Sequence, residues 1–454
     1  MKGPNESLAP EDALQTTRAL LAGGAGIAAS DVFIRRERNL EIRSKNQELS
    51  AFREKLNCTI AIRLSNESSC VVASSSDLSV QGLKDLIHRG RSLLRGAQSG
   101  PFKRIVPIED APVGMTYDGS FSDVPVDEKV SRVLNMSSLT VKSCGKYPKD
   151  VKATYSEKET EEWLWAPGAK RVITHKNTWA RISARALLER TEGSRGFEAC
   201  SLKTQYFDLD WSGMARAASI GAVALGEGRA LEGGRYRALI DAEVMVPFVK
   251  LLGDALRGDR VLTGRSFLEV SQLEKTIFSE ALNLVEDPER MSRAGYRLWD
   301  AEGHICTRQV FVEKGRLLGF AFDNSAGWRE GYASNHQAVR PTVGHHPHPG
   351  FHSLAIPAES KDPVDLRREL DRGIWIQNID MLTLLQPGSG EFIGCFSGRW
   401  VEKGEPAEGL TRILVRGDLK SLFSKIVSVS RDVSWSEHFG SPSVIVEEIE
   451  VIGT

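Results

Sequence analysis

The chain has 454 residues and a formal net charge of −1, with 41% hydrophobic and 26% charged residues. This composition is that of an ordinary globular protein, so it excludes a disordered, collagen-like or coiled-coil chain, and the length suits two or three domains. The balance of charge argues against a dedicated binder of nucleic acid or of an anionic membrane, because such proteins carry a basic surface.

The sequence shows no targeting or membrane signal. The N-terminus lacks the apolar core of a signal peptide, and no later run approaches the roughly 20 apolar residues of a spanning helix. The six cysteines are scattered singly without a C-x-x-C pair, which is typical of reduced thiols rather than of a disulfide framework or a zinc cluster. We therefore expect a cytoplasmic protein.

The first hundred residues predict a helix, an antiparallel meander and a second helix. A proline followed by two acids at residues 10–12 is typical of a helix start, and alternating apolar residues between 30 and 74 predict strands. The second helix is marked by one apolar face, formed by Leu83, Leu86, Ile87 and Leu94. Residues 98–127 are rich in Pro, Gly, Ser and Asp, which predicts a boundary. We expect an N-terminal α+β domain with its linker over residues 1–125.

Residues 126–454 predict a larger, sheet-rich C-terminal domain. Short strands separated by turns are expected over residues 150–210. Residues 214–225 and 244–255 predict helices on either side of a strand at 236–240. Strand patterns then dominate, with a hairpin around Glu313-Lys314-Gly315. The fold class predicted for the whole chain is α+β.

A histidine-rich loop is the densest cluster of possible ligands. Residues 344–352 contain four of the nine histidines, namely His345, His346, His348 and His352. Imidazole binds zinc, nickel or copper well, but the prolines exclude a helix and no acidic base is adjacent. An exposed polar loop, a substrate contact and a metal site all remain open, and substrate contact is favoured over a metal because long loops on a rigid sheet often line sites.

Sequence signatures of independent catalysis are missing. The chain has no H-E-x-x-H, no G-x-S-x-G and no phosphate-binding loop, which disfavours a metallopeptidase of that type, a serine hydrolase and a nucleotide enzyme. The run Ile374-Trp375-Ile376-Gln377-Asn378 is typical of a half-buried strand. It follows the histidine loop closely, so we expect Trp375 and Asn378 to contact a ligand from a strand end.

Several strings in the C-terminal half match one known family. They are residues 264–268 (Gly-Arg-Ser-Phe-Leu), 286–288 (Glu-Asp-Pro), 399–405 (Arg-Trp-Val-Glu-Lys-Gly-Glu), 417–419 (Gly-Asp-Leu) and 426–430 (Ile-Val-Ser-Val-Ser). With them the chain resembles the TldD/TldE (PmbA) family of zinc metallopeptidase subunits, and within it the TldE-like branch. The resemblance is strongest over residues 235–454.

The resemblance implies that this chain lacks the zinc ligands of its catalytic relatives. TldD-like members carry H-E-x-x-x-H on a helix and a later cysteine. Here Gly253 and Gly258 stand at the two histidine positions, Asp254 stands at the glutamate position, and no thiol is found around residues 438–440. The resemblance therefore implies no catalytic residue and no metal in this chain, with zinc in a TldD-like partner.

The function implied is that of a non-catalytic subunit in a heterodimeric zinc metallopeptidase that cleaves small or unfolded peptides, or a peptide-like biosynthetic intermediate. The histidine loop, Trp375 and Asn378 are expected on the wall of an enclosed substrate cavity. Two alternatives remain open: a stand-alone metal-dependent peptidase or hydrolase that uses His345–His352, and a homodimeric peptide-binding scaffold. No nucleic acid or membrane partner is expected.

Overall fold

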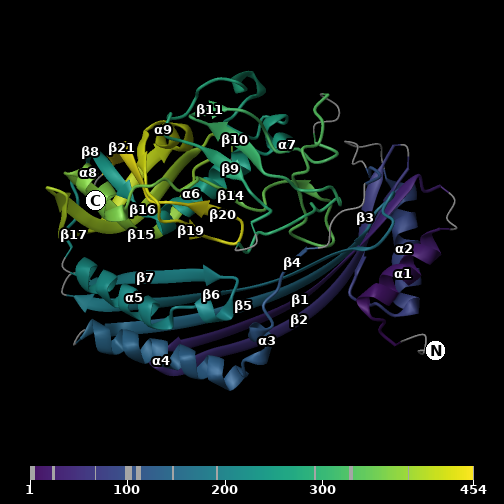
Figure 1. Cartoon of the computed structure of the whole chain (residues 1–454), viewed down its shortest axis with the longest axis horizontal. Helices are drawn as coiled ribbons and strands as arrows, with labels where there is room; N and C mark the ends of the chain where they lie inside the picture. Colours follow the sequence, from purple (N-terminus) through teal and green to yellow (C-terminus); the bar gives the residue numbers. More distant parts are fainter. Residues whose placement is uncertain are drawn as a thin grey trace.

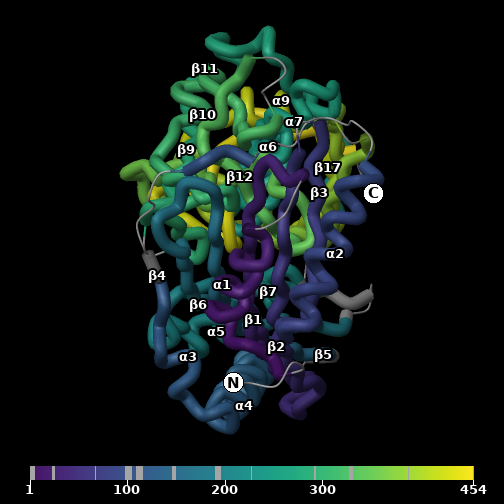
Figure 2. The backbone as a smooth tube through the Cα atoms, turned by 90° about the vertical axis from the view of Figure 1, so that its right-hand side faces the viewer, coloured from purple at the N-terminus to yellow at the C-terminus, as the bar shows by residue number. Residues whose placement is uncertain are grey.

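The structure is a computed structural model that describes residues 6–452 except for 23–25, 67, 98–104, 109–113, 146–147, 191–192, 227, 291–292, 327–330 and 387. Two layers lie against each other (Figure 1): a long curved sheet with its helices, and a compact C-terminal body above it. The same arrangement is seen in the turned view of Figure 2. Helix and sheet are mixed throughout, as the fold class predicted.

The first layer is built on a seven-stranded sheet with the order β3-β2-β1-β5-β6-β4, in which β7 also pairs with β6. Its strands are β1 (Ala29–Lys45), β2 (Glu48–Ser65), β3 (Cys70–Ser75), β4 (Gly114–Thr116), β5 (Pro148–Trp165), β6 (Ile173–Arg190) and β7 (Gly193–Lys203). The strands β1, β2, β5 and β6 are 17 or 18 residues long. They give the layer its elongated shape.

Helices cover this sheet in two groups. The helices α1 (Pro10–Leu21) and α2 (Val80–Gly96) pack at one end, where leucines and isoleucines of both helices meet those of β1 and β2 in one core. The helices α3 (Ser120–Asp123), α4 (Val126–Cys144) and α5 (Trp211–Gly226), with the short helix η1 (Tyr206–Asp208), lie toward the other end. The apolar spacing that predicted the helices is the spacing that forms these cores.

The strand lengths expected between residues 150 and 210 were wrong. That region folds into two 18-residue strands and a further strand instead of several short ones. Charged residues interrupt the apolar pattern, but they are paired across the sheet: Lys176 contacts Glu161 at 2.8 Å and Glu159 at 3.2 Å. Cross-strand pairs of opposite charge stabilise a strand that its own sequence pattern does not reveal.

The sheet also continues past residue 125. Strand β5 pairs antiparallel with β1 from Trp165 opposite Val32 to Lys152 opposite Lys45. A cut between residues 125 and 126 would therefore separate strands that are hydrogen-bonded to each other. Much of the linker expected at 98–127 lies outside the described residues.

The C-terminal body contains a sheet that closes on itself. Its order is β17-β16-β15-β8-β21-β18, and β17 also pairs with β21. The strands are β8 (Gly234–Ile240), β15 (Gly373–Leu384), β16 (Glu391–Glu402), β17 (Glu405–Asp418), β18 (Ile426–Val429) and β21 (Val444–Val451). Helix α6 (Ala242–Ala255) packs its apolar face into the main core of this body.

A second sheet of the body has the order β11-β10-β9-β14-β20-β19. Its strands are β9 (Leu284–Glu286), β10 (Gln309–Glu313), β11 (Arg316–Leu317), β14 (Leu354–Ala355), β19 (Ser434–Trp435) and β20 (Phe439–Ser441). The remaining elements are α7 (Gly258–Val261), α8 (Pro363–Leu370), α9 (Leu419–Ser424), η2 (Val270–Gln272), β12 (Ala338–Val339) and β13 (His348–Pro349).

Several local predictions for residues 214–315, and the expectation for the cysteines, are confirmed. The helices at 214–225 and 244–255 and the strand between them are α5, α6 and β8. The hairpin at Lys314-Gly315 joins β10 to β11, and both turn residues have the positive φ of a tight hairpin turn, 44° and 75°. The six cysteines are free. Among the described helices, none combines the length and the hydropathy needed to cross a membrane.

Candidate functional site

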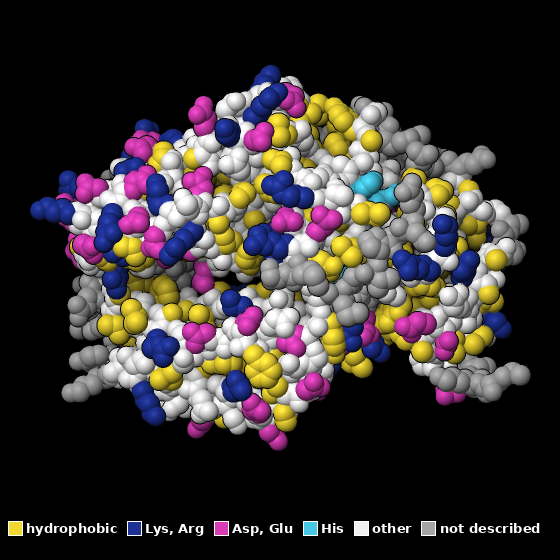
Figure 3. Space-filling model, in the orientation of Figure 1, with side chains coloured by type: hydrophobic (Ala, Val, Ile, Leu, Met, Phe, Trp, Pro, Cys, Tyr) yellow, Lys and Arg dark blue, Asp and Glu magenta, His cyan; other side chains and the backbone are white. Residues whose placement is uncertain are grey.

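Two cavities lie at opposite ends of α6, where the C-terminal body faces the first layer. Figure 3 shows a hollow between the two layers on one face of the molecule. The cavity at the start of α6, here called the acidic cavity, has a volume of 1020 Å³. The cavity near the end of α6, here called the histidine cavity, has a volume of 390 Å³. Both are large enough for a small ligand or a short peptide segment.

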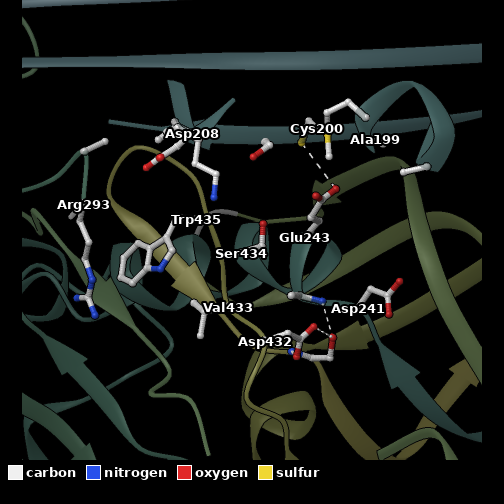
Figure 4. A pocket seen from close by; sticks show the side chains of 18 of the residues that line it. Ala199, Cys200, Asp208, Asp241, Glu243, Arg293, Asp432, Val433, Ser434 and Trp435 are labelled. Atoms are coloured by element: carbon white, nitrogen blue, oxygen red, sulfur yellow. Dashed lines mark hydrogen bonds between the residues drawn. The ribbon is translucent and has the colours of Figure 1, made fainter. Parts of the chain in front are cut away.

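The acidic cavity takes its walls from both layers. Strand β7 and helix α5 form one side, and the other side is formed by the first turn of α6, by β15 and by residues 432–435. The acids that line it are Asp208, Asp241, Glu243 and Asp432. Figure 4 shows Glu243 facing Cys200, with Asp241 and Asp432 nearby on the side of the C-terminal body.

Burial changes the protonation of two of these acids. It raises the pKa of Asp241 to about 7, an effect increased by Asp432 and Glu243 and opposed by the indole of Trp375, whose Nε1 donates to Asp241 Oδ1 at 2.5 Å. Burial likewise raises the pKa of Glu243 to about 7. Both carboxyl groups can therefore gain or lose a proton close to neutral pH.

A chain of hydrogen bonds fixes the start of α6 in this cavity. The backbone N–H of Ala242 donates to Ser443 Oγ at 3.0 Å, and the same hydroxyl donates to Asp432 Oδ2 at 2.7 Å. The serine thus satisfies one of the free N–H groups at the helix start and connects it to the 432–435 segment. The arrangement keeps Asp241, Glu243 and Asp432 in one place although they come from different parts of the sequence.

The Cys200 thiol, which lines the acidic cavity, is not an activated nucleophile. The Cys200 thiol lies 3.7 Å from Glu243 Oε2, and burial raises the pKa of this thiol to about 11 with a further contribution from Glu243. A thiol in this state stays protonated and is a poor nucleophile. The carboxylates are suited to binding a cationic or hydrogen-bond-donating group rather than to covalent catalysis.

The histidine cavity lies around the residues expected to replace the zinc motif. Gly253 and Asp254 line it together with His348, His352, His438 and Phe439, and β1, β5 and β6 close it from the first layer. Burial lowers the pKa of His352 well below its ordinary value, and it also lowers the pKa of His438. His438 Nδ1 is 3.1 Å from the His352 carbonyl oxygen, and His352 Nε2 is 3.2 Å from that of Ala338. These ring atoms are engaged in holding the backbone.

Phenylalanine rings fill the space beside both glycines. A Cβ placed on Gly253 would lie 2.8 Å from Phe439 Cε1, and one placed on Gly258 would lie 2.1 Å from Phe322 Cε1. A histidine at either position would have to displace a phenylalanine ring. Across the described residues, no group of three or more His, Cys, Asp or Glu side chains is arranged to hold a metal ion. The residues present therefore do not fit the zinc that the resemblance assigns to the catalytic branch.

The histidine loop does not converge on one point. His348 and His352 line the histidine cavity, whereas His346 lines a different cavity beside β3 and α2. The described contact of His345 is a backbone hydrogen bond to Thr342 within the loop. The loop thus supplies two side chains to one cavity rather than a four-histidine cluster.

The two residues expected from β15 also separate. Trp375 lines the acidic cavity and binds Asp241, and its neighbour Gln377 lies on the same wall. Asn378 is outside the lining of that cavity, and its amide donates to Asp380 at 3.0 Å and to Ser397 at 3.2 Å. Trp375 and Gln377 thus face the same cavity, although the register of β15 is irregular between Ile376 and Asn378.

Sequence reasoning missed Asp241, Glu243 and Asp432. Asp241 precedes a helix and is followed by an acid in the first turn, which resembles an ordinary helix start. Asp432 is almost 200 residues further along the chain. In the sequence, only the apolar residues on both sides of Asp241, in β8 and α6, indicated that this part of the chain is enclosed.

Comparison with known proteins gives a consistent result. Residues 233–453 match the family described as the PmbA/TldA metallopeptidase C-terminal domain. A metalloprotease PmbA homolog of Buchnera aphidicola is 21% identical over 440 residues, which cover 94% of this chain and 93% of that protein. The metalloprotease PmbA of Escherichia coli O157:H7 is 23% identical over 206 residues, covering 45% of this chain and 43% of that protein.

Solved structures share the fold over almost the whole chain. TldE from Thermococcus kodakarensis superposes with a TM-score of 0.86 at 15% identity and covers 98% of this chain and 99% of that one. A Thermotoga maritima protein, solved as a proposed modulator of a DNA gyrase, gives a TM-score of 0.88 at 20% identity and covers 98% of this chain and all of the other. Residues 233–453 therefore carry the C-terminal domain of the PmbA/TldA metallopeptidase family, and the chain as a whole is similar to PmbA metalloproteases and shares the fold of TldE.

Proposed function

We propose that this chain is a non-catalytic, TldE-like subunit of a heterodimeric zinc metallopeptidase. The zinc would be held by its TldD-like partner, where it would supply the activated water for peptide hydrolysis. This chain forms part of the wall of an enclosed cavity that admits small or unfolded peptides, or a peptide-like biosynthetic intermediate. The protein acts in the cytoplasm.

One observation carries the proposal: the phenylalanine rings beside Gly253 and Gly258 occupy the space that metal-binding side chains would need. The two glycines have no side chain with which to bind a metal. A chain that kept its own zinc site would have polar ligands there instead of apolar packing. The cavities at both ends of α6 nevertheless remain, which suits a subunit that contacts substrate without catalysing its cleavage.

The alternative of a stand-alone metal hydrolase built on the histidine loop receives no support from the geometry. His346 lines a different cavity from His348 and His352. A homodimeric peptide-binding scaffold is compatible with the same cavities, and the experiment below separates it from the heterodimer.

The test is to produce the chain alone, a TldD-like partner alone and the two together, and to measure zinc content and cleavage of an unfolded peptide. We expect zinc in the partner and in the complex, and faster cleavage by the complex than by either chain. Stoichiometric zinc and peptide cleavage in the isolated chain would refute the proposal. An isolated chain that forms a stable homodimer and never associates with the partner would favour the scaffold.

The matched variant for this test is His346→Ala/His348→Ala. It removes two imidazoles of the loop and leaves Gly253 and Gly258 as they are. We expect the zinc content of the complex to be unchanged, whereas a loss of zinc would favour the stand-alone hydrolase.

A further inference from the structure

A third cavity, here called the arginine cavity, gathers four guanidinium groups. It has a volume of 520 Å³ and is lined by Arg290, Arg293, Arg308 and Arg431. The arginines come from segments beside β9, β10 and β19. Asp287 is the one acid among the described residues that line the cavity. The cavity therefore has a strong positive potential, although the whole chain is close to neutral.

Two of these arginines have no side-chain partner among the residues that the structure describes. Arg293 lies 3.6 Å from Asp287, and Arg431 is paired with Asp362. In the described part of the chain, no ion pair or side-chain hydrogen bond engages Arg290 or Arg308, and both are exposed. Positive charges that lie close together without counter-charges repel one another, which raises the free energy of the protein without its ligand. An anion bound between them would relieve that repulsion.

Arg293 is held in a fixed orientation at the wall that separates this cavity from the acidic cavity. Its guanidinium carbon lies 4.1 Å from the centre of the Trp435 ring, and its Nη1 donates to Ser353 Oγ at 3.1 Å. Figure 4 shows Arg293 and Trp435 side by side. Burial, helped by nearby Arg290 and opposed by Asp287, lowers the pKa of Arg293 to about 10. The guanidinium still carries its charge at neutral pH, and a stacked arginine presents a planar fork to an oxyanion.

We propose that the arginine cavity binds a ligand with two or more neighbouring carboxylate groups, of the kind carried by an acidic peptide segment. Arg290, Arg293 and Arg308 are the residues that contact it. The apolar wall formed by Ile356, Pro357 and Ala358 packs against the methylene groups of such side chains, which a bare inorganic ion would not use. The choice of a peptide as the source of the carboxylates rests on the proposed function, whereas the anion site itself does not.

The test measures binding to the isolated full-length chain by calorimetry. The probe is a tetraglutamate peptide with blocked termini, and the neutral control peptide is tetraglutamine with blocked termini. Pyrophosphate tests whether the site binds a phosphate ligand instead of carboxylates. We expect saturable binding of tetraglutamate that weakens as the salt concentration rises, because exposed charges are screened. Tetraglutamine is expected not to bind.

The test variant is Arg290→Gln/Arg308→Gln, which removes the two unpaired charges and no described side-chain contact. We expect it to weaken tetraglutamate binding by about tenfold or more, since each charge-assisted contact contributes strongly to affinity. The matched control is Arg53→Gln/Arg235→Gln, which removes two positive charges from side chains that are 72% and 70% exposed and lie outside the cavity lining. The control is expected to bind within about twofold of the original chain.

Binding of tetraglutamine as strong as that of tetraglutamate, or equal weakening by both double variants, would overturn the proposal. Binding of pyrophosphate without tetraglutamate would overturn the peptide assignment and identify a phosphate ligand. The measurement needs neither the partner subunit nor zinc nor cleavage. A failed peptidase assay therefore leaves the site standing, and a failed binding assay leaves the peptidase proposal standing.

Discussion

Gly253 and Gly258 are glycines because of what lies beside them rather than because of a turn. Neither has a positive φ, and each adjoins a phenylalanine ring that packs into the space of the absent side chain. If the proposed function is correct, the absence of metal ligands at these two positions goes together with the aromatic packing beside them. A single substitution to histidine would not provide a ligand, because the ring would still occupy the space that the imidazole needs.

Substitution of Gly258 by alanine tests this packing. The new Cβ would lie 2.1 Å from Phe322 Cε1 and 2.8 Å from the carbonyl oxygen of Ala321. We expect the free energy of unfolding to fall by about 1–3 kcal/mol, the usual cost of overpacking a core. Urea denaturation followed by fluorescence measures it.

The control for that prediction is Gly319→Ala, because the added Cβ would meet nothing within 4 Å. It should change the unfolding free energy by no more than about 0.5 kcal/mol in either direction. If Gly258→Ala is as stable as the control, Phe322 yields easily and the space beside Gly258 is not closed.

At the scale of the elements, the two ends of the apolar helix α6 contribute residues to two different cavities. Asp241, which precedes the helix, and Glu243 of its first turn lie in the acidic cavity, and its last turns bring Gly253 and Asp254 to the histidine cavity. The helix can do this because its other face is fixed in the main core of the C-terminal body. Ligands in either cavity would therefore contact a rigid support.

The raised pKa of Asp241 predicts a pH-dependent effect of Asp241→Asn. The unfolded chain releases this proton near pH 4, whereas the folded chain keeps it to about pH 7. Ionisation therefore favours the unfolded state more and more as the pH rises from about 4 to 7. Asparagine cannot ionise and can still accept from Trp375, so the variant should gain stability relative to the original chain over this range, by up to about 4 kcal/mol, and the gain should level off above pH 7.

Unfolding in urea at pH 4, 5.5, 7 and 8.5 measures this difference. Asp365→Asn is the control, because its carboxylate on α8 is 60% exposed and pairs only with Arg368 among the described residues. The control should show a small difference at every pH. A difference for Asp241→Asn that does not vary with pH would mean that this carboxyl is ionised throughout.

The same elements show how far the sequence could predict the structure. Helix α6 and the hairpin at Lys314-Gly315 were predictable because apolar spacing and turn residues are local signals. The run from Glu157 to Glu162 is entirely polar and shows no apolar alternation, yet it lies within the single long strand β5, where its charges meet arginines and lysines of other strands. The acidic and arginine cavities could not be predicted, since their charged residues come together only through the tertiary fold.

At the scale of the whole molecule, the two layers are joined by buried ion pairs as well as by apolar contact. Arg63 of β2 binds Asp31 of β1 and, through Nη1 at 2.9 Å, Glu302 of the C-terminal body. Arg35 of β1 donates to the carbonyl oxygens of Arg340 and Pro341. Such contacts are sensitive to geometry, and they hold the cavities between the layers in a defined shape.

Glu162 is the clearest of these links, and Glu162→Gln tests it. This buried carboxylate of β5 binds Arg35 within the first layer at 2.7 Å and Arg297 of the C-terminal body. Loss of its charge leaves two guanidinium groups without their counter-ion, so we expect a loss of about 3–5 kcal/mol at pH 7. Burial alone would raise the pKa of Glu162, but Arg297 and Arg35 outweigh burial and hold it well below its ordinary value. The stabilisation is therefore complete above about pH 4.5, and it declines as the pH falls toward the lower folded-state pKa.

The difference in unfolding free energy between the original chain and Glu162→Gln should consequently shrink in acid, which urea denaturation at pH 7 and pH 3 can measure. Glu408→Gln is the control, since Glu408 and Arg229 form a pair in which both side chains are almost half exposed. This control should lose no more than about 1 kcal/mol. If Glu162→Gln proves as harmless as the control, the ion pairs of Glu162 contribute little to holding the layers together. A large loss that vanishes in acid would show instead that one carboxylate joins the sheet of the first layer to the body that carries α6.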